Sequence, residues 1–247
     1  MMSKIKQIAG WQLRYALPSV GIFYAVIALV YVTFGILISV LPEGEMSYGG
    51  SSFSTCVFLF VCGIIYCREC LHFGLANGVS RRSIFAGYIV SGIILDVGMS
   101  LVSVIAKNLF VLAVGPQGSM EPFDFIYSGS AIYQTFLGFW GEVLFLTGFG
   151  LLALMIGYLV SMFNYRSGKL LKVLVWATFG FVCFLVPTLL ATLLSESAKR
   201  ALGAFFGKVG AFFAATPVNA FLLGFGIAAI LGVCCWLFVR RVPLKTS

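Results

Sequence analysis

The chain has 247 residues, of which 61% are hydrophobic and only 10% are charged, and its mean hydropathy is +1.06. A soluble domain of this size cannot bury so much apolar surface, so the composition excludes an ordinary soluble protein and predicts an integral membrane protein. The net charge of +8 is spread over loops and ends, which argues against a nucleic-acid partner and fits basic loops that fix the orientation of membrane helices.

Residues 3–17 are predicted to form an amphipathic helix that lies in the inner membrane interface. Lys4, Lys6 and Arg14 stand among apolar residues in this segment, as in helices that bury one face among lipid headgroups. A plain basic leader is the alternative. The apolar run that follows Arg14 is too long for the core of a cleavable signal peptide, so we expect it to act as a signal anchor.

Six apolar runs are predicted to be transmembrane helices. The expected fold class is all-α, a polytopic membrane protein with a single transmembrane domain that covers residues 1–247. Pro18 is placed at the start of the first run, where its missing N–H is not needed. The predicted spans are residues 18–41, 53–66, 84–106, 132–162, 173–194 and 218–238. Glycines expected to allow close helix packing are Gly148, Gly150, Gly157, Gly224, Gly226 and Gly232.

The Lys and Arg residues orient these spans, because cytosolic loops retain basic residues. Four segments are predicted to be cytosolic, and both termini are among them. Two of the three outside segments, residues 42–52 and the loop of residues 115–131, hold no Lys or Arg. The four cytosolic segments each hold three: Lys4, Lys6 and Arg14; Arg68, Arg81 and Arg82; Arg166, Lys169 and Lys172; Arg240, Arg241 and Lys245.

The third outside segment, residues 195–217, departs from this charge pattern, since it contains Lys199, Arg200 and Lys208. On a helical wheel its large apolar residues share one face, which predicts an amphipathic external helix at the outer membrane surface, ended by Pro217. The alternative is a miscounted span that would make this segment cytosolic. The residues on the apolar face are Leu202, Phe205, Phe206, Val209, Phe212 and Phe213.

Enzyme and metal signatures are missing from the sequence. There is no phosphate-binding loop motif, no zinc-protease motif and only one histidine, so the chain is not predicted to be an enzyme or to hold a cofactor. Cys67, Cys70 and His72 do not have the spacing of haem attachment, and a zinc ion would need a fourth ligand. The seven cysteines lie in apolar runs or near the cytosolic side, so no disulfide framework is indicated.

Three ionisable residues fall within or near the spans, where charge is costly. Asp96 lies roughly 18 Å from the inner end of its span, counting 1.5 Å per residue. It either lines a path or has a structural role. Lys107 and Glu142 fall at similar outer depths on neighbouring spans, which permits an ion pair. For these two residues a structural pair or an interfacial position is favoured over a path-lining role.

A polar stretch, residues 68–84, interrupts the apolar runs between the second and third predicted spans. Arg68 and Glu69 end one helix, an Asn-Gly pair signals a turn, and Ser80 suits the N-cap of the next helix. The sequence Phe-Gly-Leu-Ala-Asn-Gly-Val-Ser-Arg-Arg-Ser-Ile-Phe, residues 73–85, resembles the loop between spans two and three in permease subunits of ABC transporters of the type-2 exporter class. Six spans, cytosolic ends, an amphipathic N-terminal helix and an external helix between spans five and six match that family as well.

The resemblance implies a coupling helix in this loop that docks on a separate ABC ATPase subunit. ATP and Mg would bind that partner, a second permease copy or a sister permease would complete the path, and the cargo would be a peptide, a lipid-like compound or a drug. From the residues alone, an ordinary basic loop on anionic lipid is an equal alternative. A secondary transporter, a channel or an immunity or assembly factor stay open as well. The contact residues implied are Glu69, Gly78, Val79, Ser80, Arg81 and Arg82.

Overall fold

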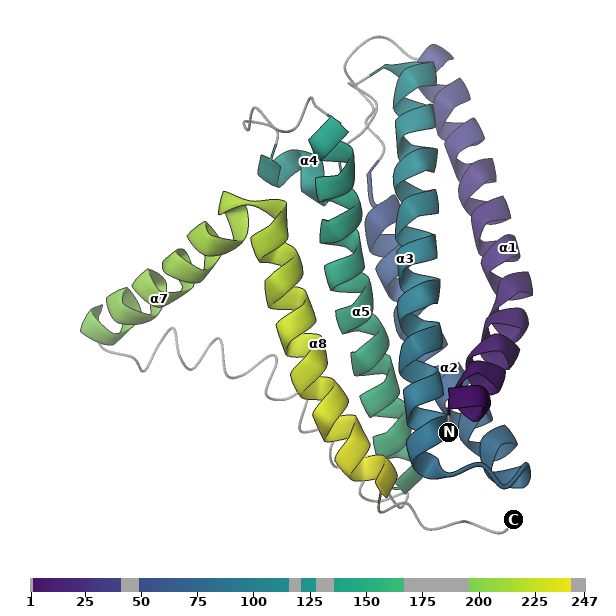
Figure 1. The fold of residues 1–247 in the computed structure, drawn as a ribbon. Helices are drawn as coiled ribbons and strands as arrows, with labels where there is room; N and C mark the ends of the chain where they lie inside the picture. Colours follow the sequence, from purple (N-terminus) through teal and green to yellow (C-terminus); the bar gives the residue numbers. More distant parts are fainter. Residues whose placement is uncertain (1, 41–48, 116–120, 128–135, 167–195, 241–247) are drawn as a thin grey trace.

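The computed structural model describes residues 2–40, 49–115, 121–127, 136–166 and 196–240, and this part of the chain contains helices and no strand (Figure 1). Five helices are long and apolar enough to cross a membrane: α1, α2, α3, α5 and α8. The described part of the chain is therefore all-helical, as predicted, and its apolar helices support a membrane-embedded protein. The predicted fifth span, residues 173–194, lies outside the described residues. The helices are α1 (Met2–Val40), α2 (Ser51–Ala76), α3 (Arg81–Val114), α4 (Pro122–Tyr127), α5 (Phe136–Arg166), α7 (Glu196–Ala215) and α8 (Pro217–Arg240).

α1 is one continuous helix, so the predicted helix start at Pro18 is wrong. The segment expected to lie separately at the membrane interface is docked on the bundle. Ile8 and Ala16 are buried, and Gln12 accepts a hydrogen bond of 2.8 Å from the Ser91 hydroxyl of α3. Proline removes one backbone donor and bends a helix, and packing on both sides of the bend keeps the helix intact. Figure 1 shows α1 changing direction in its N-terminal half.

α2 runs ten residues further than the predicted end at Tyr66. Apolar positions in the added turns recur at helical spacing and are buried, which explains the extension: Cys67, Cys70, Leu71 and Gly74. The connection to α3 is only residues 77–80. Gly78 has φ +64°, a left-handed conformation that glycine adopts without strain, and Ser80 accepts from the Ser83 N–H as the N-cap of α3.

The predicted N-cap is therefore confirmed, and a separate short helix between α2 and α3 is wrong. The residues expected to form that helix are the last turns of α2 and the four-residue connection that follows. We call residues 77–80 together with the adjoining turns of α2 and α3 the α2–α3 turn.

α5 packs against α2 and α8 through glycine contacts that bring backbones together. A Cβ added at Gly157 would lie 2.2 Å from the Phe60 carbonyl oxygen of α2, and one added at Gly224 would lie 2.7 Å from the Gly148 carbonyl oxygen. Such small-residue contacts are the usual means of helix association in membranes. Three of the six predicted packing glycines, Gly148, Gly157 and Gly224, meet backbone atoms in this way. Gly150 meets side chains of α3 and α2 instead, and Gly226 and Gly232 meet no neighbour within 4 Å.

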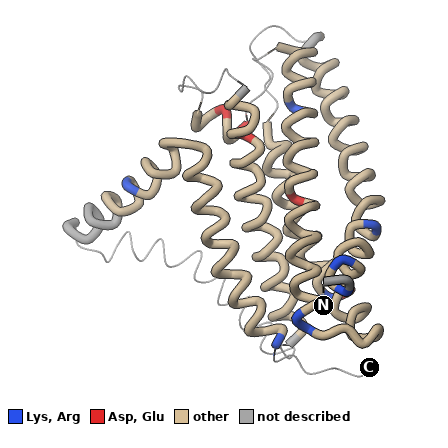
Figure 2. Tube along the Cα trace, viewed as in Figure 1, with Lys and Arg blue, Asp and Glu red and all other residues tan. Residues whose placement is uncertain are grey.

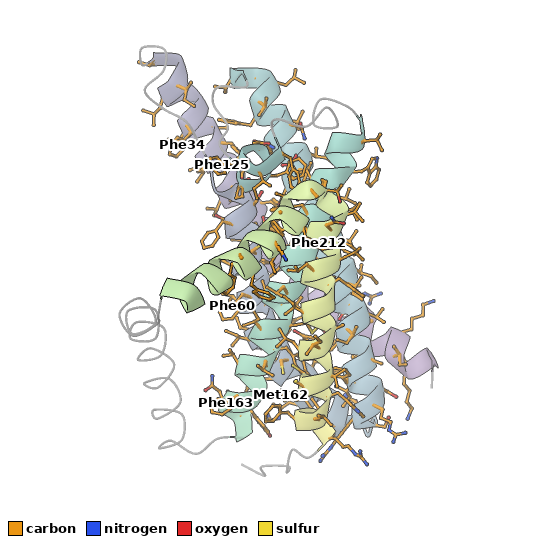
Figure 3. The ribbon with its side chains drawn as sticks, turned by 90° about the vertical axis from the view of Figure 1, so that its left-hand side faces the viewer. Phe34, Phe60, Phe125, Met162, Phe163 and Phe212 are labelled. Carbon is orange, nitrogen blue, oxygen red and sulfur yellow. The ribbon has the colours of Figure 1, made fainter. Side chains whose placement is uncertain are left out.

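The end of the bundle away from the α2–α3 turn contains two features outside the predicted spans. The short helix α4 occupies a segment expected to be a loop. α7 ends at Ala215, and Asn219 of α8 donates from its side-chain amide to the Phe212 carbonyl oxygen at 2.9 Å, which fixes the junction. Figures 1 and 3 show α7 projecting from the bundle at this junction, with Phe212 labelled in Figure 3. Phe205, Phe206 and Phe212 are exposed.

Candidate functional site

Charge is segregated between the two ends of the bundle. Figure 2 shows most basic positions gathered where α1 begins, α2 turns into α3 and α8 ends. Acidic positions lie in the middle and the other half of the bundle, where one basic position lies on α3 and another on α7. We call the two ends the basic end and the acidic end. This segregation is what the positive-inside rule expects of a membrane protein. The described basic residues at the basic end are Lys4, Lys6, Arg14, Arg68, Arg81, Arg82 and Arg240.

The α2–α3 turn contains five of the six predicted partner-contact residues, residues 78–82, at the basic end, whereas Glu69 lies about two turns back on α2. Gly78, Ser80 and Arg82 are exposed, and Val79 is partly buried against the main apolar core. The Val79 N–H donates to the Gly74 carbonyl oxygen at 2.9 Å, which closes the end of α2. The turn is therefore a short, hydrogen-bonded protrusion instead of a loose loop.

α1 holds the turn from one side through aromatic contacts that sequence reasoning missed. Trp11 stacks on Phe73 with ring centroids 4.2 Å apart and planes 1° from parallel. The Tyr15 hydroxyl donates to the Glu69 carboxylate at 3.1 Å. Aromatic stacking adds about 0.5–1.5 kcal/mol to the free energy of area burial. Trp11 and Tyr15 are four residues apart and therefore share one face of a helix. This spacing was the sequence signal that could have predicted their contact with a neighbouring helix.

Close packing stiffens the base of the turn. A Cβ added at Gly74 would lie 2.6 Å from the side chain of Ile84, so α2 and α3 touch at this level. A Cβ added at Gly87 would lie 2.8 Å from Ile8 of α1. Ile8 is 2% exposed and fills the space that the glycine leaves. Three helices therefore meet without gaps just above the turn.

Arg81 holds the turn from the other side. Its guanidinium donates to the backbone carbonyl oxygen of Arg240 at 3.2 Å, at the last residue of α8. The last carbonyl groups of a helix have no partner within the helix, and a cation there is favourable. Arg81 is thus a contact between the turn and α8, whereas Arg82 leaves its side chain exposed.

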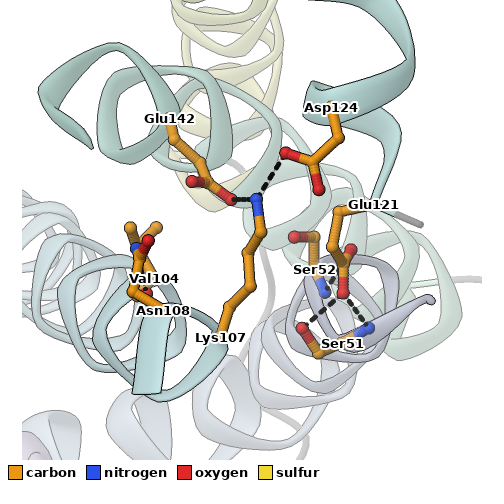
Figure 4. A network of polar contacts seen from close by, with 8 residues as sticks. All are labelled: Ser51, Ser52, Val104, Lys107, Asn108, Glu121, Asp124 and Glu142. Carbon is orange, nitrogen blue, oxygen red and sulfur yellow. Dashed lines mark hydrogen bonds and ion pairs between the residues drawn. The ribbon is translucent and has the colours of Figure 1, made fainter. Parts of the chain in front are cut away.

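At the acidic end Lys107 of α3 lies between two carboxylates (Figure 4). Its ammonium nitrogen is 2.7 Å from a Glu142 oxygen and 2.5 Å from an Asp124 oxygen. The expected contact between Lys107 and Glu142 is present. Asp124 was missed because it lies in a segment expected to be a loop, and its position on α4 brings it to the ammonium group. The three residues tie α3, α4 and α5 together.

Glu121 caps α2 next to this cluster (Figure 4). Its carboxylate accepts hydrogen bonds from the Ser51 N–H at 2.8 Å, the Ser51 hydroxyl at 2.6 Å and the Ser52 N–H at 3.3 Å. A helix N-terminus offers unpaired N–H groups and a partial positive charge, so a carboxylate is favoured there. Glu121 is 1% exposed. Apart from its being acidic, nothing in the sequence predicted that it caps α2.

Asp96 stands apart from both groups. It is 0% exposed in the middle of α3, and neither carboxylate oxygen has a hydrogen-bond partner among the described residues. A Cβ added at Gly150 of α5 would lie 1.8 Å from an Asp96 oxygen, so the carboxyl group occupies the space that this glycine leaves empty. Asp96 is therefore separate from the pair formed by Lys107 and Glu142.

No protein-family model, curated protein or solved structure matches the chain. Within the described part of the chain no three His, Cys, Asp or Glu side chains are grouped to hold a metal ion. The residues point instead to two candidate activities: contact with a partner at the α2–α3 turn, and polar chemistry inside the bundle at Asp96.

Proposed function

We propose that the chain is the permease subunit of an ABC exporter of the type-2 class, driven by a separate ATPase subunit that binds ATP and Mg. The proposed family membership rests on the resemblance of residues 73–85 to the loop between spans two and three of that family, together with the pattern of spans and basic segments in the sequence. We place the basic end in the cytosol, in the cell membrane, because Lys and Arg are retained on that side.

The observation that best supports the proposal is the construction of the α2–α3 turn. A permease without its own ATPase has to receive motion from a partner through a rigid element. The turn is short, exposes Gly78, Ser80 and Arg82, and is held on both sides. α1 holds it through Trp11 and α8 through Arg81. A force on the turn would therefore reach four membrane helices at once: α1, α2, α3 and α8.

The cargo class is supported by a groove of about 740 Å³ between α1 and α3. Its walls are apolar apart from tyrosines, and the Tyr24 hydroxyl is bonded to Ser103 at 3.0 Å. A groove with these walls suits an amphipathic molecule such as a lipid-like compound, a drug or an apolar peptide. A second copy of the chain or a sister permease would close the open side of the groove, with membrane lipid around the pair.

Co-purification with an ATPase tests the proposal. The chain is purified in mild detergent together with the products of its neighbouring genes, and bound ATPase is measured. Arg82→Glu is expected to weaken ATPase binding by about tenfold, since losing a charged contact at an interface costs roughly 1–2 kcal/mol. Lys6→Glu is the matched control, because Lys6 is exposed at the same end but lies on α1. Absence of any bound ATPase, or equal loss in both variants, would reject the proposal.

A secondary transporter is the second candidate, and Asp96 is the observation that favours it. Unpaired acids within a helix bundle often mark ion or proton sites in such proteins. Transport by vesicles that contain this chain alone, without any ATPase, would identify it. A channel would conduct in the same vesicles without concentrating the cargo, and an immunity or assembly factor would show no transport under either condition.

A further inference from the structure

Four buried polar side chains form a row along one face of α3. Asp96, Ser100, Ser103 and Lys107 are spaced by four, three and four residues, and each is buried. At about 100° per residue these positions fall within roughly 60° of one another around the helix, and the row extends for about 16 Å along it. Ser91, on the same helix, lies about 140° from Asp96 around the helix axis, outside the row, and its hydroxyl donates a hydrogen bond to Gln12 of α1.

The two ends of the row differ in how well their polar atoms are satisfied. Towards the acidic end, Lys107 has two carboxylate partners, and the Ser103 hydroxyl lies 2.9 Å from the Thr55 hydroxyl and 3.0 Å from that of Tyr24. In the middle of the helix, Asp96 and the Ser100 hydroxyl are each 0% exposed. Among the described residues neither has a hydrogen-bond partner. Buried polar atoms without partners are rare and call for a functional explanation.

The environment of Asp96 suits a proton better than any larger ligand. An ionised carboxylate would have no donor and no counter-charge here, and such a charge is costly inside a membrane. Protonation removes the charge and turns one oxygen into a donor. The carboxyl group fills the space beside Gly150: a Cβ added at Gly150 would lie 1.8 Å from an Asp96 oxygen and 2.8 Å from a Leu59 methyl group. A hydrated cation has no room in that space.

Few titratable groups face Asp96 from the surrounding helices. Tyr24 of α1 and Cys56 of α2 are near enough for an electrostatic interaction with Asp96. α5 presents Gly150, and the cysteines and Arg240 of α8 lie towards the basic end. Lys107, the nearest basic residue on α3, is about 16 Å away along the helix. The charge of an ionised Asp96 is therefore not neutralised by an ion pair, which leaves proton uptake as the means of neutralising it.

We propose that Asp96 is a reversible proton-binding site and that its proton exchanges along this row, through Ser100 and the Ser103–Thr55 pair, towards the acidic end. Asp96 and Ser100 have no hydrogen-bond partner among the described residues, so each transfer requires their side chains to rotate towards each other and towards Ser103. Uptake converts the carboxylate into the acid, release returns the proton, and no other bond changes. The inference does not rest on the proposed ATPase partner, since a proton site in the bundle is compatible with either class of transporter. Serine and threonine hydroxyls suit the route because each both donates and accepts a hydrogen bond.

Infrared spectroscopy of carboxyl-labelled aspartate tests the site directly. The chain contains only two aspartates, Asp96 and Asp124, so ¹³C-carboxyl labelling gives two bands, and Asp124→Asn identifies which is which. In phosphatidylcholine vesicles the Asp96 band is expected to change from the carboxylate to the acid as the pH is lowered. In D₂O the acid band is expected to shift as deuterium replaces the proton. A band that stays acid, or stays carboxylate, at every pH at which the chain is folded would overturn the proposal.

Serine variants test the route. Ser100→Ala and Ser103→Ala are each expected to slow deuterium exchange at Asp96 by about tenfold, the effect of one lost hydrogen-bonding group on a barrier. Ser91→Ala is the matched control, because Ser91 is an equally buried serine on the same helix but outside the row. It is expected to leave exchange unchanged. Exchange in both row variants at the wild-type rate would overturn the proposed route, and the wild-type titration tests the site even where a variant does not fold.

Discussion

Asp96 and Gly150 share one small space between α3 and α5. The carboxyl oxygen stands where a Cβ would be if residue 150 had a side chain. The sequence identifies Asp96 as an acid at membrane depth and Gly150 as a packing glycine. It does not reveal that they meet, because the contact depends on the relative rotation of two helices.

Gly150→Ala is expected to destabilise the protein, although alanine is the better helix former. The added methyl group would collide with Asp96 and Leu59, and overpacking of this kind typically costs about 1–3 kcal/mol. Gly226→Ala is the control, since a Cβ there meets nothing within 4 Å. Thermal unfolding in detergent measures both. An unfolding midpoint for Gly150→Ala at or above that of Gly226→Ala would contradict the contact.

Lys107→Met is expected to lower stability strongly, because it leaves Glu142 and Asp124 facing each other without a cation. Removing one partner of a buried ion pair typically costs about 3–5 kcal/mol. Adding Glu142→Gln to Lys107→Met is expected to restore part of the loss, since one of the unpaired charges is removed. Unfolding curves of the single and double variants decide this: a double variant no more stable than Lys107→Met would argue against the ion pair.

At the scale of the elements, hydropathy and charge predicted the existence of the apolar helices but not their ends. α2 and α3 extend beyond their predicted spans at both ends, and α1 continues through Pro18. In α1 and α2, packing against neighbouring helices stabilises turns that lie outside the predicted spans. Ser80 was predicted correctly because an N-cap is a local signal. The contacts of Lys107 with Asp124 and of Glu69 with Tyr15 join different helices, so local sequence gave no sign of them.

The docking of α1 gives a prediction for that element. Trp11→Ala is expected to free the N-terminal turns of α1 from α2, because the stack on Phe73 is lost. Amide hydrogen exchange over residues 4–16 should then accelerate, while exchange in α5 stays unchanged. Tyr15→Phe keeps the ring and loses only the hydrogen bond to Glu69, so its effect should be smaller. Equal protection of residues 4–16 in wild type and Trp11→Ala would show that the stack does not hold α1.

For the whole molecule, the proposed orientation has the basic end in the cytosol and the acidic end outside. In a chain whose native cysteines are replaced by alanine, Asn77→Cys at the α2–α3 turn is expected to react only with reagent on the cytosolic side. Gly210→Cys on α7 is expected to react with a membrane-impermeant thiol reagent added outside, because Gly210 is exposed and α7 joins α8 at the acidic end. Protection of Gly210→Cys from the external reagent would contradict this orientation and show that α7 does not lie outside.

Photo-crosslinking from position 82 tests whether the α2–α3 turn receives an ATPase, as we propose. A photoreactive amino acid replaces Arg82, which is exposed beside the turn, in cells that express the chain at its natural level. A second strain carries the same group in place of Lys208, which is exposed on α7. The account predicts a covalent adduct with an ABC ATPase from position 82 and none from position 208. Adducts with lipid alone at position 82, or an ATPase adduct at both positions, would contradict it.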